Sequence, residues 1–130
     1  DLTNKKVSIL GLYFKPETDD MRDSPSLDII PILQKNGITI SAYDPVAMNE
    51  AKKLLKNTEF SNDLDTCLQN SDALVILTEW NQFRGLLPDY LSKYMKGNIL
   101  IDLRNALDPE NFINSNFNLV QIGRGREINQ

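Results

Sequence analysis

Histidine is absent from this sequence of 130 residues, and cysteine occurs only once, at Cys67. The absence of histidine excludes imidazole acid–base catalysis and histidine metal sites. A single cysteine cannot form a disulfide within the chain, which is typical of proteins from reducing compartments. Cys67 lies at helical spacing with Leu64 and Leu68, and we therefore interpret it as a buried core thiol and not as a nucleophile.

The sequence also lacks a long apolar run and an excess of positive charge. Its longest apolar stretch, ALVILT at 73–78, is far too short to cross a membrane, and we see no signal-peptide pattern. The net charge is −4 and no basic block compensates for it, which argues against a dedicated nucleic-acid binder. Hydrophobic residues still make up 41% of the chain, enough for a real core. We expect a cytoplasmic protein with neither a membrane nor a nucleic acid as its partner.

Apolar strand-like segments alternate with helical patterns along the whole chain. We expect strands at 6–10, 38–43, 73–78, 98–103 and 118–122, a very short edge strand at 59–60, and helices at about 25–36, 46–57, 63–70, 80–85 and 88–95, with a helical turn or two at 108–114. Such alternation predicts a doubly wound, mostly parallel, Rossmann-like α/β sheet with helices on both faces, in the common strand order 3-2-1-4-5-6. We expect one domain over 1–130, with a frayed polar tail at 123–130.

The glycine-rich loop of a dinucleotide-binding domain is missing after the first strand. The chain has G-L-Y-F-K-P from Gly11 onwards, where such a domain has G-x-G-x-x-G. Without the second glycine, the backbone cannot approach a pyrophosphate closely. Asp44 ends the second strand and imitates the acid that binds a ribose, but the motif that accompanies that acid is absent. We therefore expect no NAD site in this chain.

A phosphoacceptor receiver domain is also a poor match. Asp19 and Asp20 resemble its acidic pair, but no aspartate ends a central strand where the phosphoacceptor is required. The same two residues, with Arg22 and Asp23, form a candidate acid–base cluster. We favour the alternative that these side chains make a local network of ion pairs and hydrogen bonds that shapes the loop.

Two cations follow the first and fifth strands, which lie on either side of the fourth strand in the expected sheet. Lys15 comes after the first strand and Arg104 after the strand at 98–103, and the aromatic residues Phe14 and Trp80 lie near them in the expected fold. Ligands of such sheets bind beyond the carboxyl ends of the strands, near the point where the strand order reverses. Two cations with aromatic surface suit a ligand that carries phosphate and a base.

A plainer interpretation of the same cations remains open. Lys15 is then a solvated loop lysine, and Arg104 forms an ion pair with Asp102, Glu79 or the acids of the loop.

Four blocks of the sequence together resemble one enzyme family. The blocks are GLYFKPETDDMRDSPSLDIIPILQKNGITISAYDP (11–45), ALVILTEWNQFR (73–84), ILIDLRNALDP (99–109) and IGRG (122–125). The first follows the family pattern G-L-x-F-K-x-x-T-D-D-x-R-x-S-P, then a helix, a strand and Y-D-P. In this order and spacing, the chain resembles the C-terminal, UDP-binding domain of the UDP-glucose/GDP-mannose dehydrogenase family, and most of all its bacterial UDP-glucose 6-dehydrogenase branch.

The resemblance implies an activity for a longer protein. The family's full enzyme oxidises C6 of a nucleotide sugar, here UDP-glucose to UDP-glucuronate, with two hydride transfers to NAD. Its N-terminal domain binds NAD, a central domain carries the nucleophilic cysteine and dimer contacts, and the enzyme is a homodimer or larger. Cys67 matches no cysteine motif of the family. The chain begins at Asp1 and not at a methionine, and we expect it to be a piece of such an enzyme.

The resemblance also assigns substrate-binding residues. Phe14 and Lys15 match the family's F-K, where the lysine meets the nucleotide sugar and the aromatic stretch lies near the base, and Arg104 matches the arginine of the D-x-R block, a further nucleotide contact. Tyr13 departs from the small residue found in many members. We expect no catalytic residue, no metal site and no cofactor of its own in this chain.

Other functions stay open at this point. The sugar and the base are not fixed, because UDP-N-acetylmannosamine and GDP-mannose dehydrogenases share the layout. A stand-alone nucleotide-binding regulatory module and a purely structural oligomerisation domain are the alternatives from other classes. The last of these predicts that Lys15 and Arg104 can be changed without effect on ligand binding.

The first prediction concerns catalysis by the chain alone. Cations can position a nucleotide sugar, but hydride transfer requires the cofactor and the groups that orient it. We expect the purified 130-residue chain to reduce no NAD⁺ in the presence of UDP-glucose, measured by absorbance of NADH. Detectable NAD⁺ reduction would contradict this expectation.

Overall fold

A computed structural model of the chain describes residues 3–13, 24–46 and 48–122. The elements are β1 (Lys6–Leu10), α1 (Ser26–Lys35), β2 (Thr39–Tyr43), α2 (Asn49–Leu54), β3 (Thr58–Phe60), α3 (Leu64–Leu68), β4 (Ala73–Ile76), α4 (Asn81–Arg84), α5 (Pro88–Tyr94), β5 (Ile99–Asp102), the 3₁₀-helix η1 (Pro109–Phe112) and β6 (Asn118–Gln121). The expected tail at 123–130 and most of the loop after β1 lie outside the described residues. None of the helices described is long and apolar enough to span a bilayer.

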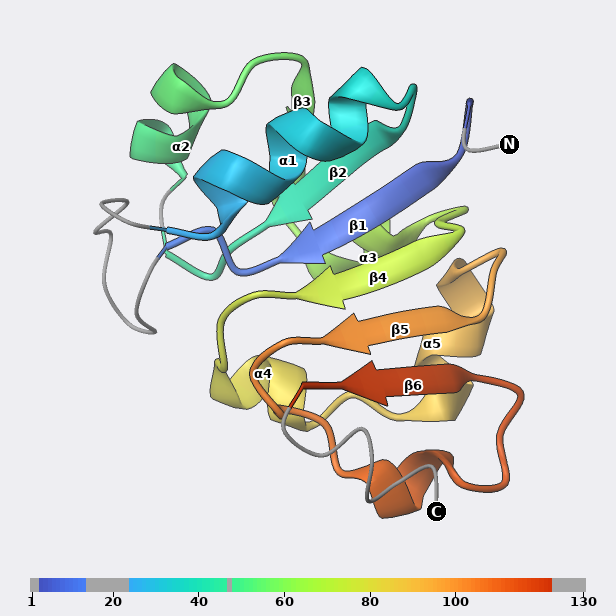
Figure 1. The fold of residues 1–130 in the computed structure, drawn as a ribbon. Helices are drawn as coiled ribbons and strands as arrows, with labels where there is room; N and C mark the ends of the chain where they lie inside the picture. The colour runs from blue at the N-terminus through green and yellow to red at the C-terminus, as the bar shows by residue number, and fades with distance from the viewer. Residues whose placement is uncertain (1–2, 14–23, 47, 123–130) are drawn as a thin grey trace.

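The strands form one six-stranded sheet in the order β3-β2-β1-β4-β5-β6, and every pairing is parallel (Figure 1). This confirms the expected strand order and the α/β class. The strand order reverses between β1 and β4: β2 and β3 are added on one side of β1, and β4, β5 and β6 on the other. β1 and β4 pair from Val7 with Ala73 to Leu10 with Ile76. The loops after these two strands therefore diverge to opposite faces, and this is where such sheets open a binding crevice.

Each face of the sheet buries its own core, because neighbouring residues of a strand point to opposite sides. In β1, Ile9 packs into the core beneath α1 and α2, while Leu10 packs into the core on the side of α3, α4 and α5. Both side chains are fully buried. A strand covered on both faces has a continuous apolar sequence, as residues 73–77 do. In β1 the buried Ser8 interrupts the apolar residues, and its hydroxyl donates to Cys67 O at 2.6 Å.

Some helices and strands are shorter than the sequence patterns predicted. The helix expected at 46–57 extends only over Asn49–Leu54, and the strand expected at 73–78 ends at Ile76. Leu77 still donates its N–H to Leu10 O at 2.9 Å, and beyond it Thr78 turns inward to the loop after β1. Apolar residues therefore continue past the ends of the regular elements, because they line the loops at the carboxyl edge of the sheet.

Gly11 marks the exit from β1 and cannot carry a side chain there. Its φ is +89°, and a Cβ built on it would lie 2.5 Å from Thr78 Cβ. The Thr78 hydroxyl fills this space and donates to Tyr13 O at 2.8 Å. The loops after β1 and β4 are thereby fixed to each other at the switch point.

Our second prediction is that Gly11→Ala lowers the free energy of unfolding by about 2 kcal/mol or more, because it adds a left-handed strain and a steric overlap. Gly85→Ala is the matched control: the φ of Gly85 is −86°, and the nearest heavy atom to its added Cβ lies 3.9 Å away. The control is expected to change stability by less than about 1 kcal/mol in urea unfolding. Equal losses in both variants would contradict the role of Thr78.

Candidate functional site

The loops after β1, β4 and β5 meet at the carboxyl edge of the sheet. Because β4 and β5 pair in parallel with Ile76 opposite Asp102, the residues that follow them emerge next to each other. Glu79 comes three residues after Ile76, and Arg104 comes two residues after Asp102. The topology therefore brings a carboxylate and a guanidinium together from segments 25 residues apart.

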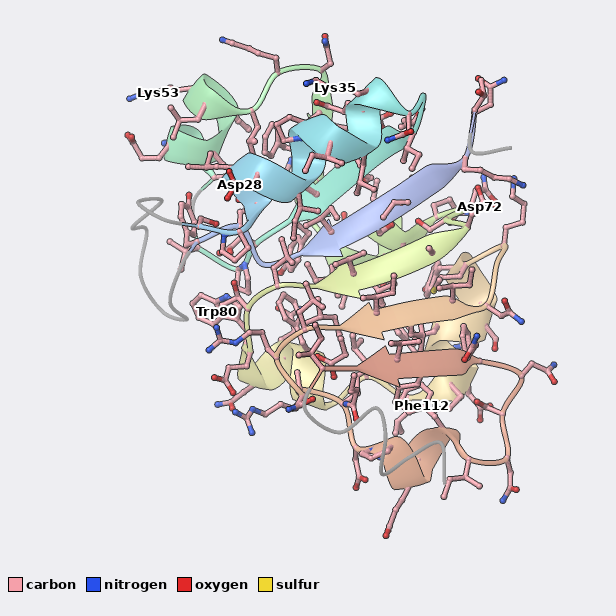
Figure 2. All side chains as sticks on the ribbon, in the orientation of Figure 1. Asp28, Lys35, Lys53, Asp72, Trp80 and Phe112 are labelled. Carbon is pink, nitrogen blue, oxygen red and sulfur yellow. The ribbon has the colours of Figure 1, made fainter. Side chains whose placement is uncertain are left out.

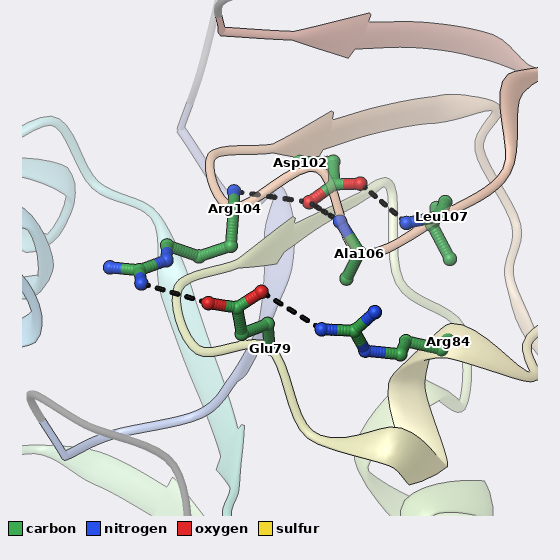
Figure 3. Close-up of polar contacts among 6 residues, drawn as sticks. All are labelled: Glu79, Arg84, Asp102, Arg104, Ala106 and Leu107. Atoms are coloured by element: carbon green, nitrogen blue, oxygen red, sulfur yellow. Dashed lines mark hydrogen bonds and ion pairs between the residues drawn. The ribbon is translucent and has the colours of Figure 1, made fainter.

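Arg104 forms its side-chain ion pair with Glu79. Arg104 Nη2 lies 3.1 Å from Glu79 Oε1, and Arg84 Nη2, from the last residue of α4, lies 3.0 Å from Glu79 Oε2 (Figure 3). The side chain of Arg104 remains 37% exposed. Of the partners that the sequence left open, Glu79 is therefore the one that the structure selects among the described residues, and Asp102 contacts Arg104 only through the backbone.

Asp102 is the group that fixes the backbone of Arg104. Its carboxylate is fully buried; Oδ1 accepts the N–H groups of Arg104 at 3.2 Å and Ala106 at 3.1 Å, and Oδ2 accepts that of Leu107 at 2.8 Å (Figure 3). Oδ2 also accepts from Gln121 Nε2 of β6 at 2.8 Å. The loop wraps around one carboxylate, so the Cα of Arg104 has one position from which its side chain reaches the edge.

Sequence reasoning did not find this role of Asp102, nor the pairing of Arg84 with Glu79. An aspartate that ends a strand and is followed by turn residues often accepts backbone N–H groups ahead of it. The signal was thus present in D-L-R-N, where Asn105 adopts a φ of 55° to turn the loop. Arg84 gave no such signal, because polar residues are common around a short surface helix and nothing in their spacing singles out the pair Glu79 and Arg84.

Asp44 has a structural role: it holds two loops together. It is buried, and its carboxylate accepts the N–H of Leu12 at 2.8 Å and that of Val46 at 3.0 Å. Burial raises its pKa above the ordinary value, while these backbone N–H groups oppose the rise. Its oxygens thus hold the loops after β1 and β2, in place of the ribose hydroxyls that the same position holds in dinucleotide-binding domains.

Trp80 lies at the same edge (Figure 2), close enough to Asp44 to affect the pKa of that carboxyl. It is partly buried, and its Nε1 makes no hydrogen bond of normal geometry within the described part of the chain. The indole helps to lower the pKa of Asp44, although its N–H makes no hydrogen bond to any described residue. Because it is the single tryptophan of the chain, it reports on events at this edge.

Several expected residues lie outside the described residues. These are Phe14 and Lys15, and the loop positions Asp19, Asp20, Arg22 and Asp23. Their convergence with Arg104 and the role of the acidic cluster stay predictions. Within the ranges that the structure describes, no group of acidic or cysteine side chains has the arrangement of a metal site.

Cys67 does not have the environment of a catalytic thiol. It is fully buried in α3, and its Sγ donates to Ser41 O at 3.4 Å. Burial raises its pKa to about 11, so the thiolate is scarce at neutral pH. This confirms the interpretation of Cys67 as a core residue.

Comparison with known proteins identifies the family to which this domain belongs. Residues 8–109 match the family model described as "UDP-glucose/GDP-mannose dehydrogenase family, UDP binding domain". The chain belongs to this family. The match begins in β1 and ends at the start of η1, so it contains Asp44, Glu79, Asp102 and Arg104.

Relatives of this UDP-binding domain are longer enzymes. It is 42% identical over 124 residues to UDP-glucose 6-dehydrogenase of Rhizobium meliloti (strain 1021), an overlap of 95% of this chain and 28% of that protein. It is 36% identical over 121 residues to UDP-glucose 6-dehydrogenase TuaD of Bacillus subtilis (strain 168), an overlap of 92% of this chain and 26% of that protein. The chain thus spans little more than a quarter of the curated relatives it matches.

A solved structure shares the fold of this UDP-binding domain. The NDP-N-acetyl-D-galactosaminuronic acid dehydrogenase of Methanosarcina mazei Go1 matches with a TM-score of 0.83 at 29% identity, over 99% of this chain and 26% of that chain. The Rossmann-like architecture is therefore that of a dehydrogenase domain.

The third prediction tests the buried carboxylate. Asp102→Asn places an amide N–H₂ among N–H donors, so we expect the free energy of unfolding to fall by about 2 kcal/mol or more. Asp108→Asn is the matched control on the same loop, because Asp108 is exposed and accepts one N–H, from Glu110 at 3.0 Å; it should cost about 1 kcal/mol or less. Urea unfolding measures both, and equal costs would contradict the role given to Asp102.

Proposed function

We propose that this chain is the nucleotide-sugar-binding domain of an NAD-dependent UDP-glucose 6-dehydrogenase, with Phe14, Lys15 and Arg104 contacting the substrate. The observation that carries the proposal is the placement of Arg104. Its backbone is fixed by the buried Asp102, its guanidinium lies at the carboxyl edge near the switch point, and Nη2 is the only one of its side-chain nitrogens that any described residue accepts from.

The chemistry of a guanidinium in this place suits a diphosphate. Its planar N–H groups bind phosphate oxygens in pairs, and a charge-assisted hydrogen bond of this kind is stronger than a neutral one. While Glu79 holds Nη2, the other side-chain nitrogens of Arg104 donate to none of the described residues, which leaves them for such a ligand. The family's UDP-binding description and the UDP-glucose 6-dehydrogenases among the relatives support uridine and glucose as the base and the sugar.

The first residues after β1, from Gly11 to Tyr13, do not fit a dinucleotide. Leu12 and Tyr13, the residues that follow Gly11, are buried, and the space above Gly11 is occupied by Thr78. Backbone N–H groups here are turned to Tyr43 O and to Asp44, and so do not form an open cradle for a pyrophosphate. We therefore place NAD in a part of the whole enzyme beyond this chain. A cytoplasmic, homodimeric or larger enzyme is proposed on the family resemblance alone.

The fourth prediction is a ligand titration of the chain, followed by the fluorescence of Trp80. We expect UDP and UDP-glucose to give a saturable change, GDP a weaker one and NAD⁺ none. Arg104→Gln should weaken UDP binding about tenfold, since it removes a charge-assisted contact to phosphate.

The matched control for this titration is Lys96→Gln. Lys96 precedes β5 at the opposite edge of the sheet and pairs with Asp72 at 3.6 Å, so its loss removes one positive charge without touching the site. It should leave the affinity for UDP within twofold. Absence of any response to UDP, an equal response to NAD⁺, or an unchanged affinity in Arg104→Gln would each contradict the proposal.

A further inference from the structure

Glu79 forms ion pairs with two arginines, Arg104 and Arg84. Oε1 contacts Arg104 and Oε2 contacts Arg84, each through a single Nη2 atom at 3.1 and 3.0 Å (Figure 3). Two guanidinium groups and one carboxylate leave a surplus of one positive charge. Figure 3 also shows that the two arginines approach from opposite sides, one from the loop after β5 and one from α4.

An arginine and a carboxylate that are alone tend to pair differently. The planar guanidinium and the planar carboxylate match in a two-point contact, with two parallel N–H···O bonds. Such a contact with Glu79 would engage two nitrogens of Arg104 and leave fewer donors for a ligand. The observed contact engages one nitrogen: Glu79 turns Oε1 to Arg104 and Oε2 to Arg84 on its other side, so the plane of the carboxylate does not face two nitrogens of Arg104 at once (Figure 3).

Arg84 is held in this position by the fold. It is the last residue of the short helix α4, and the preceding residue, Phe83, is fully buried in the core against Tyr43, with ring centroids 6.4 Å apart. With Phe83 anchored, the next side chain points to the surface and toward Glu79. The arginine is 52% exposed and Glu79 is 32% exposed, so the pair alone contributes little to stability.

We propose that Arg84 is a positioning residue of the nucleotide site, which keeps Arg104 open to phosphate by holding the second oxygen of Glu79 turned away from Arg104. Arg84 acts through Glu79 and does not touch the ligand. The inference rests on the proposed function only in naming that ligand as a nucleoside diphosphate. The contact that Arg84 prevents, a two-point pair between Glu79 and Arg104, belongs to the free protein.

The fifth prediction measures UDP affinity in a cycle of variants. Arg84→Gln should weaken UDP binding about two- to fivefold, because Glu79 then closes on Arg104, and Arg84→Lys should restore it. In the Glu79→Gln background the same Arg84→Gln change should have no effect, since a glutamine has one acceptor oxygen and cannot form the two-point pair. Lys96→Gln controls for the loss of one charge.

A second measurement reads the pairing without any ligand. The ¹⁵N resonances of Arg104 side-chain N–H groups, assigned by their loss in Arg104→Lys, should show slower proton exchange at a second nitrogen in Arg84→Gln. This change should vanish in the double variant Glu79→Gln, Arg84→Gln.

The outcomes separate the inference from the proposed function. If UDP does not bind the parent chain, the proposed function fails, and the exchange measurement alone decides the inference. An Arg84→Gln chain with unchanged Arg104 exchange overturns the inference. An equal loss of UDP affinity in both backgrounds also overturns it, because Arg84 would then contact the nucleotide directly.

Discussion

The buried carboxylate of Asp102 is the constraint on which the carboxyl edge of this domain depends. It sits at the end of β5, has no exposed surface, and accepts hydrogen bonds from three backbone N–H groups and from Gln121 of β6. An isolated buried carboxylate is costly, and it is tolerated only where such donors surround it. One group therefore fixes the loop that carries Arg104 and joins that loop to the edge strand.

A second buried carboxylate performs the matching task on the other side of the switch point. Asp44 joins the loop after β1 to the loop after β2, and Thr78 joins the loop after β1 to the loop after β4. Hydrogen bonds from side chains to backbone thus form a rigid frame at this edge of the sheet, and this frame holds the partly exposed arginines Arg84 and Arg104. Rigid support of this kind is what allows a few charged groups to recognise a ligand with little reorganisation.

Sequence reasoning predicted the architecture well because the physical signals are local. Apolar runs such as 73–78 identify strands buried on both faces, and the regular alternation with helices sets parallel pairing and strand order. It overestimated the lengths of α2 and β4, because apolar residues such as Leu77 continue to pack after the regular hydrogen bonding ends. The site was harder, since Glu79 and Asp102 were equally near to Arg104 in the expected fold, and only the register of β4 against β5 separates their roles.

The charge arrangement of the edge shows how this frame bears on recognition. Asp102 and Asp44 use their oxygens to hold loops, so Glu79 is the carboxylate that pairs with the Arg104 side chain among the described residues, and one of its two oxygens is turned to Arg84. Under the proposed function, a ligand that carries phosphate would meet a guanidinium whose backbone is fixed and whose anionic partner, Glu79, is shared with Arg84. Because the three side chains remain partly exposed, salt screens their interactions, and the geometry of the contacts matters more than their strength. In the proposed role of Arg104, the number of its N–H donors that the fold leaves open would set the affinity of this edge for phosphate.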